Sequence, residues 1–178
     1  EKLTLKEILT VHPKGIEYGS LFSDHPYLPL LWDKEGQILS FPPIINSREI
    51  GEVQTGDSDL LVEVTGTDLR MVLLTLNIFA TNLADRGAEI DPIDIAYPYS
   101  TEWGKTVRTP CDISEVKKIP VHVIESALGL SMGSETVYKA LISYGYQVKA
   151  SRHTLAVRLP SYRSDLMHPI DVAEDVAI

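Results

Sequence analysis

Proline and glycine interrupt the first third of this 178-residue chain and limit what it can form. Residues 1–59 contain five of each, which leaves stretches too short for long regular elements. They are Pro13, Pro26, Pro29, Pro42, Pro43, Gly15, Gly19, Gly36, Gly51 and Gly56. We therefore predict a loop-rich beginning with a helix over 4–9 capped by Thr4, and strands over 37–41 and 59–65.

The remainder of the chain alternates helical and strand patterns. Apolar residues at helical spacing predict an amphipathic helix over 69–83, capped by Thr67 or Asp68 and ended by Gly87. Strands are expected over 90–97 and 105–109. After a change of character near 112–120, helices over 120–129 and from Ser134 to Gly145 precede a hairpin and a final helix from Pro169.

This order predicts an α+β fold with two domains. Residues 1–110 would form a mixed α/β domain, and residues 111–178 a small winged-helix-like α+β domain. The chain begins at Glu1 rather than at a methionine and stops inside an expected helix. We therefore interpret it as a fragment. Because the sequence has no basic leader with an apolar stretch and no apolar run near the roughly 20 residues of a membrane span, we expect neither a signal peptide nor a membrane anchor.

Composition narrows the function. Sixteen basic residues against 25 acidic ones give a formal charge of −9, so any nucleic-acid contact must be local or use parts outside this chain. The lone Cys111 excludes an internal disulfide framework and fits a reducing, cytoplasmic setting. The sequence has no GxxxxGK[ST], GxGxxG, HExxH or GxSxG motif, and its five histidines are scattered.

Two segments carry candidate binding residues. LSFPPIIN (39–46) brings a strand into two prolines that each fix φ, and LLVEVTGTD (60–68) leads into a helix. Glu63 points away from Val62 and Val64, so in an enclosed site it needs a hydrogen-bonding partner such as a ligand hydroxyl. The simpler alternatives remain open: a strand end packed on the core, and a solvent-facing glutamate before a capped helix.

The third segment is acidic. Asp171, Glu174 and Asp175 lie at helical i, i+3 and i+4 spacing, and Asp165 precedes them. Such a cluster tolerates its own repulsion when a cation such as Mg²⁺ sits among the oxygens. Acidic residues also favour a helix N-terminus through the helix dipole, and the pattern leaves both interpretations open.

LSFPPIIN, VEVTGTDL and PSYRSDLMHPIDVAEDVAI together resemble the beta subunits of phenylalanyl-tRNA synthetases of the archaeal and eukaryotic type. The resemblance implies a tRNA-editing domain over 1–110, possibly truncated at its start, and a small domain leading into a catalytic-like core. The full enzyme charges tRNA(Phe) with phenylalanine using ATP, as a heterotetramer of two alpha and two beta subunits. We expect this fragment neither to bind ATP nor to ligate alone.

The resemblance also implies a site for hydrolysing misacylated tyrosyl-tRNA(Phe). Glu63 would bind the tyrosine hydroxyl, because an apolar pocket alone rejects an added hydroxyl only about a hundredfold. Ser40 and Thr65 would be catalytic by orienting the ester or a water assisted by the terminal ribose hydroxyl. The remaining implied residues are the pocket wall Leu31, the backbone-shaping Pro42, Pro43 and Gly66, and the magnesium ligands Asp165, Asp171, Glu174 and Asp175. The alternative is a non-catalytic tRNA-binding or subunit-assembly module.

Overall fold

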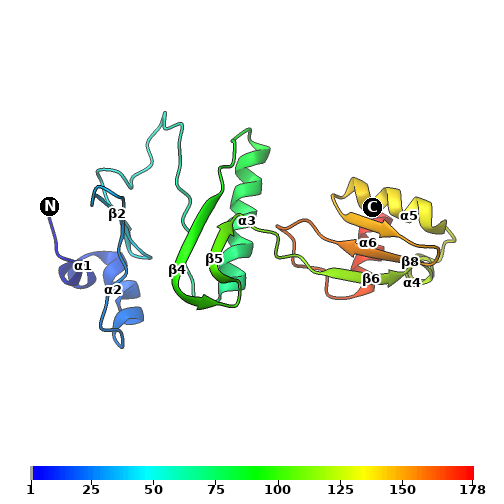
Figure 1. The fold of residues 1–178 in the computed structure, drawn as a ribbon, viewed down its shortest axis with the longest axis horizontal. Helices are drawn as coiled ribbons and strands as arrows, with labels where there is room; N and C mark the ends of the chain where they lie inside the picture. Colours follow the sequence, from blue (N-terminus) through cyan, green and yellow to red (C-terminus); the bar gives the residue numbers. More distant parts are fainter. Residues whose placement is uncertain (1) are drawn as a thin grey trace. The chain divides into compact units, whose positions relative to one another are not determined.

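The fold is α+β, as predicted, and consists of two compact units. A computed structural model describes residues 2–178, with one unit ending at Thr65 and the other beginning at Gly66. The described residues form helices and three small antiparallel sheets (Figure 1).

The first unit has short elements, as its prolines and glycines predict. Thr4 caps the first helix, because its hydroxyl accepts the Glu7 amide while the Glu7 carboxylate accepts the Thr4 amide. The first sheet has the order β1-β2-β3, so the predicted strand over 37–41 is its middle strand. The elements are α1 (Leu5–Val11), α2 (Pro13–Tyr18), the 3-10 helix η1 (Gly19–Phe22), β1 (Leu31–Trp32), β2 (Ile38–Phe41) and β3 (Ile45–Asn46).

The second unit begins with one long helix beside a hairpin. Asp68 caps α3 (Leu69–Asp85) by accepting the Met71 amide, and Gly87 follows the helix with φ 92°. Strands β4 (Ile93–Thr101) and β5 (Gly104–Thr109) pair in an antiparallel hairpin. A small buried cluster joins α3, β5 and the segment after β5 through Leu73, Leu74, Val107 and Ile113.

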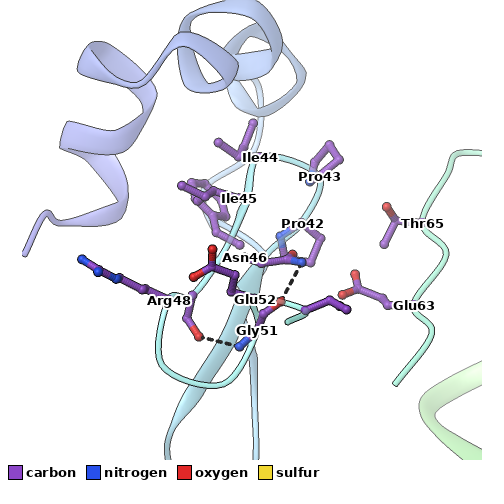
Figure 2. Close-up of a pocket in the computed structure, with 13 residues that line it drawn as sticks. Pro42, Pro43, Ile44, Ile45, Asn46, Arg48, Gly51, Glu52, Glu63 and Thr65 are labelled. Carbon is purple, nitrogen blue, oxygen red and sulfur yellow. Dashed lines mark hydrogen bonds between the residues drawn. The ribbon is translucent and has the colours of Figure 1, made fainter. Parts of the chain in front are cut away.

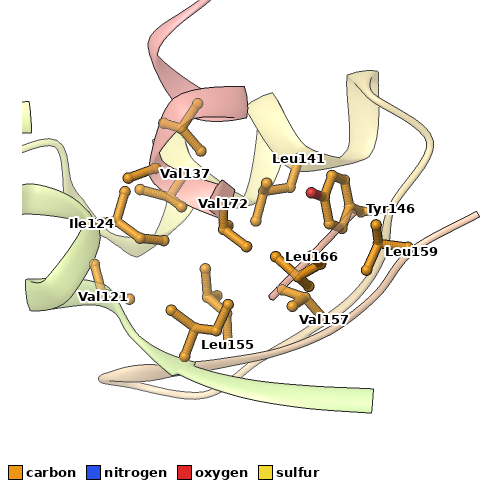
Figure 3. Close-up of a cluster of buried hydrophobic side chains, with 13 residues drawn as sticks. Val121, Ile124, Val137, Leu141, Tyr146, Leu155, Val157, Leu159, Leu166 and Val172 are labelled. Carbon is orange, nitrogen blue, oxygen red and sulfur yellow. The ribbon is translucent and has the colours of Figure 1, made fainter. Parts of the chain in front are cut away.

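The C-terminal part of this unit holds the larger core. Its sheet has the order β6-β8-β7, and α4, α5 and α6 bury side chains in the same cluster as the sheet (Figure 3). Ile124, Leu155 and Val172 are completely buried there. The elements are β6 (Val116–Pro120), α4 (Val121–Leu128), α5 (Gly133–Ser143), β7 (Gln147–Ala150), β8 (Thr154–Arg158) and α6 (Pro169–Ala177).

Two local predictions were wrong, and strand β6 was not predicted. The segment 59–65 keeps the predicted alternation of exposure, but no strand is assigned to it among the described residues. Strand β6 pairs with β8, which is distant in the sequence, and local sequence patterns do not indicate such a contact. Ser134 does not cap α5: the Glu125 carboxylate on α4 accepts the Met132 and Gly133 amides at 3.0 and 2.9 Å instead.

The expected domain boundary between residues 110 and 111 lies inside the second unit and remains a prediction. The division of the chain at Thr65 falls within the region expected to be one domain. Over the described residues, no helix combines the length and the apolar character that crossing a membrane would require.

Asn77 links distant parts of the second unit. Its side chain is 2% exposed, and its amide nitrogen donates to the carbonyl oxygens of Cys111 at 2.8 Å and Ser161 at 2.9 Å. These residues lie after β5 and after β8, so one amide on α3 satisfies two carbonyls from separate connecting segments. A buried carbonyl that loses its donor costs about 1–3 kcal/mol.

Replacing Asn77 should therefore destabilise the second unit. We expect Asn77→Ala to lower the free energy of unfolding by about 2 kcal/mol or more. The melting temperature should fall by about 4–8 °C. Asn82→Ala, an exposed position on the same helix, is the matched control and should change stability little. Equal melting temperatures for the two variants in thermal denaturation would contradict this role.

Candidate functional site

The first unit contains an open cavity of about 720 Å³. The β2–β3 turn forms one wall with Pro42, Pro43 and Ile44, and Glu63 and Thr65 line it from the segment before α3 (Figure 2). This volume falls within the range of about 300–1,000 Å³ that small-molecule sites occupy. The sequence motifs at 39–46 and 60–68 thus meet at one cavity, although many residues separate them.

The three-stranded sheet brings two predicted residues together beside this cavity. Ser40 on β2 pairs with Leu31 on β1 and with Asn46 on β3, so these residues form a row across the sheet. Ser40 is 5% exposed, and Leu31 is half-buried. Neither lines the cavity directly. Leu31 is therefore a neighbour of Ser40, and it does not belong to the cavity wall that the described residues form.

A hydrogen bond connects the sheet to the acidic residue of the cavity. The Ser40 hydroxyl donates to Oε2 of Glu63 at 2.9 Å. Glu63 is otherwise exposed and carries its carboxylate at the cavity wall. Because a carboxylate has acceptor sites on both oxygens, this bond orients the group and leaves Oε1 open for a ligand donor. Thr65, two residues later on an extended segment, is also exposed toward the cavity.

Gly66 begins the second unit and does not line the cavity. A β-carbon added there would lie 2.9 Å from Cγ2 of Val72, so the backbone passes close to the start of α3. Its expected part in shaping the site remains a prediction.

Sequence reasoning missed four polar residues that line the cavity: Asn46, Ser47, Arg48 and Glu52. Asn46 ends the LSFPPIIN motif, and recognising the two prolines as a hairpin turn would have placed it opposite Ser40. Arg48 and Glu52 lie in the loop that follows, where the sequence offers no periodic signal. No histidine or cysteine lines this cavity within the part of the chain that the structure describes.

The loop after β3 closes tightly on the sheet. Asn46 donates its side-chain amide to the Gly51 carbonyl at 3.0 Å, and the Gly51 amide donates to the Ser47 carbonyl at 3.2 Å. A β-carbon on Gly51 would lie 2.2 Å from the carbonyl oxygen of Leu39 on β2. Only glycine fits there without a backbone shift, so Gly51 fixes the loop that carries Arg48.

The four predicted magnesium ligands do not converge. Asp171 accepts the His168 and Met167 amides at the start of α6, and these bonds hold the pKa of its carboxyl below the usual value. Asp165 and Asp175 are both bound to Arg163, and Glu174 is exposed. Over residues 2–178, no group of three or more histidine, cysteine, aspartate or glutamate side chains is arranged to share a metal. As arranged, the cluster does not fit a magnesium ion.

The chain is similar in sequence to known proteins over its whole length. Residues 117–178 match the tRNA synthetase B5 domain family. The chain is 41% identical over 179 residues to the phenylalanine–tRNA ligase beta subunit of Pyrococcus furiosus. The alignment covers 100% of this chain and 31% of the Pyrococcus protein. It is also 38% identical over 176 residues to the phenylalanine–tRNA ligase beta subunit of Treponema pallidum. That alignment covers 99% of this chain and 29% of the Treponema protein.

A solved structure of a related protein has the same fold. An N-terminal fragment of the phenylalanyl-tRNA synthetase beta subunit from Pyrococcus horikoshii superposes with a TM-score of 0.82 at 34% identity, covering 99% of this chain and 50% of that chain. The chain belongs to the phenylalanine–tRNA ligase beta-subunit family. It spans about 30% of the length of these curated beta subunits. The predicted family is therefore confirmed, and the B5 match coincides with the C-terminal core.

Enlarging Gly51 should disturb the cavity loop. We expect Gly51→Ala to lower the melting temperature of the chain and to expose the loop to proteolysis, because the new methyl group collides with the β2 backbone. Gly19→Ala is the control: its β-carbon would have no neighbour closer than 3.7 Å, and its backbone is helical. Equal protease sensitivity and equal melting temperatures in the two variants would show that the loop tolerates the change.

Proposed function

We propose that this chain carries the editing site of a phenylalanine–tRNA ligase beta subunit and hydrolyses tyrosyl-tRNA(Phe). The observation that supports it most directly is the Glu63 carboxylate, held by Ser40 at the wall of a cavity of ligand size. The relatives named above are beta subunits of a ligase that handles phenylalanine. Such an enzyme faces tyrosine as a competitor that differs by one hydroxyl.

The physical need for a second site follows from that single hydroxyl. An apolar pocket shaped for phenylalanine rejects tyrosine only about a hundredfold. A site that accepts a hydrogen bond from the hydroxyl favours tyrosine over phenylalanine, because phenylalanine would leave the acceptor unpaired. Glu63 has the right chemistry: an ionised carboxylate is an acceptor only, and Ser40 already occupies one of its oxygens.

The hydrolytic step is assigned to an ordered water. The cavity-lining residues of the described chain include no histidine or cysteine that could form a nucleophile–base pair. We infer that the terminal ribose hydroxyl of the tRNA assists the water and that Thr65 orients the water or the ester. Water attack breaks the acyl–oxygen bond and releases free tyrosine and the tRNA. Ser40 then acts by holding Glu63 rather than by attacking the ester.

The remaining parts of the ligase activity lie beyond this chain. We propose that the complete enzyme uses ATP and Mg²⁺ to charge tRNA(Phe) in the cytoplasm, with an alpha-subunit partner in an α₂β₂ assembly. The non-catalytic alternative applies best to residues 111–178. That region has its own hydrophobic core and matches the B5 family, so tRNA binding or subunit assembly would be its contribution.

The first test measures deacylation of tyrosyl-tRNA(Phe) and phenylalanyl-tRNA(Phe) side by side. We expect Glu63→Ala to reduce the preference for the tyrosyl ester by about tenfold to a hundredfold, because it removes a hydrogen bond to a charged acceptor. Circular dichroism should show an intact fold, since Glu63 is exposed. Trapping an acyl-enzyme on Ser40 would overturn the water mechanism.

Two other glutamates serve as controls. Glu52 also lines the cavity but is not bonded to Ser40, and Glu49 is exposed outside it. Glu52→Ala and Glu49→Ala should leave the tyrosyl preference unchanged. If Glu52→Ala removes the preference and Glu63→Ala does not, the hydroxyl acceptor has been assigned to the wrong carboxylate.

A double-mutant cycle tests the Ser40–Glu63 pair. We expect Ser40→Ala to weaken the tyrosyl preference in the same direction as Glu63→Ala but by less, because the freed carboxylate still accepts a hydrogen bond. The double variant should lose no more preference than Glu63→Ala alone, since Ser40 acts through Glu63. Additive losses, measured by the same deacylation assay, would mean that Ser40 acts independently on the ester.

A further inference from the structure

Arg163 occupies the centre of the acidic cluster near the C-terminus. It lies in the connection between β8 and α6. Its Nε and Nη2 donate to Oδ1 and Oδ2 of Asp165 at 2.9 and 2.6 Å, and its Nη1 donates to Oδ2 of Asp175 at 2.6 Å. One guanidinium therefore bridges two of the four carboxylates that the sequence assigned to magnesium.

Tyr146 completes this arrangement. Its hydroxyl donates to the same Oδ2 of Asp175 at 2.6 Å, and the Arg163 guanidinium lies 5.5 Å from the centre of its ring. The side chains of Arg163 and Asp175 are only 21% and 14% exposed.

Half of the eight carboxylate oxygens of the four predicted magnesium ligands already accept hydrogen bonds. Both oxygens of Asp165 bind Arg163, one oxygen of Asp175 accepts two donors, and one oxygen of Asp171 accepts two backbone amides. A magnesium ion requires oxygens at about 2.0–2.1 Å in near-octahedral geometry. It would also have to approach a buried positive charge. An ion coordinated by Asp165 would have to displace Arg163, which occupies both oxygens of that carboxylate.

We propose that Arg163 takes the place of a divalent cation in this chain and clamps α6 to the rest of the C-terminal core. The planar guanidinium matches the fork of Asp165, which a point charge such as lysine does not. Arg163 binds Asp175 on α6 and Asp165 in its own connecting segment. It also lies over the ring of Tyr146, the residue that precedes β7. Arg163 is thus a positioning residue that holds α6 against the C-terminal core.

Magnesium titration of the full chain tests the proposal. The probe is magnesium chloride against EDTA at matched ionic strength, and the readout is the melting temperature. An ion present at a hundred times its Kd would raise it by about 5–10 °C for a chain of this size. We expect no magnesium-dependent rise for the unmodified chain. A rise that Asp175→Asn abolishes would overturn the proposal, and this measurement needs no destabilised variant.

A matched pair of arginine variants tests the clamp. Arg158 also forms an ion pair, with Asp112 at 2.7 Å, but outside the cluster and with more solvent exposure. Arg163→Met should lower the melting temperature more than Arg158→Met, since it leaves Asp175 half-buried without its cation. Arg163→Lys should recover only part of the loss, because an ammonium cannot bridge in the same way. Equal losses for Arg163→Met and Arg158→Met would contradict the clamp.

Discussion

The candidate site depends on one hydrogen bond between residues far apart in the sequence. Ser40 is buried in the middle strand of the first sheet, and its hydroxyl has Glu63 as its acceptor. The segment around Glu63 has no strand pairing in the described chain, so this bond fixes where the carboxylate lies. The bond orients the Glu63 carboxylate at the cavity wall, and Thr65 lies two residues further along the same segment. A buried hydroxyl that must find an acceptor thus organises the proposed editing site.

The same type of side chain has two different tasks in the two units. Glu63 is exposed at a cavity and has one oxygen open, which suits recognition of a ligand hydroxyl. Asp175 is half-buried and is already bound by a guanidinium and a phenol, which suits a structural clamp. The difference comes from the neighbours: a hydroxyl satisfies a carboxylate partly, whereas Arg163 neutralises it. Proximity in sequence to other acids therefore does not establish a metal site.

Several elements could be predicted because their signals are local. The amphipathic spacing of α3, its cap at Asp68 and its end before Gly87 lie within one continuous segment. The errors concern elements whose state depends on distant partners. Strand β6 exists because β8 lies beside it, and the start of α5 is capped by Glu125 from the preceding helix rather than by the nearby Ser134. Local sequence cannot specify such contacts.

The sequence by itself determined the family through its motifs and the α+β class through its hydrophobic periodicity, and it predicted Glu63 and Thr65 among the residues that line the cavity. These signals are local, because each lies within a short continuous segment of the chain. Only the tertiary structure decided how those residues are used. It placed Ser40 against Glu63, left Leu31 off the cavity wall, and put Arg163 between Asp165 and Asp175. The reason is physical: a polar side chain acquires its role from the partner that satisfies it, and that partner is chosen by folding rather than by adjacency in sequence.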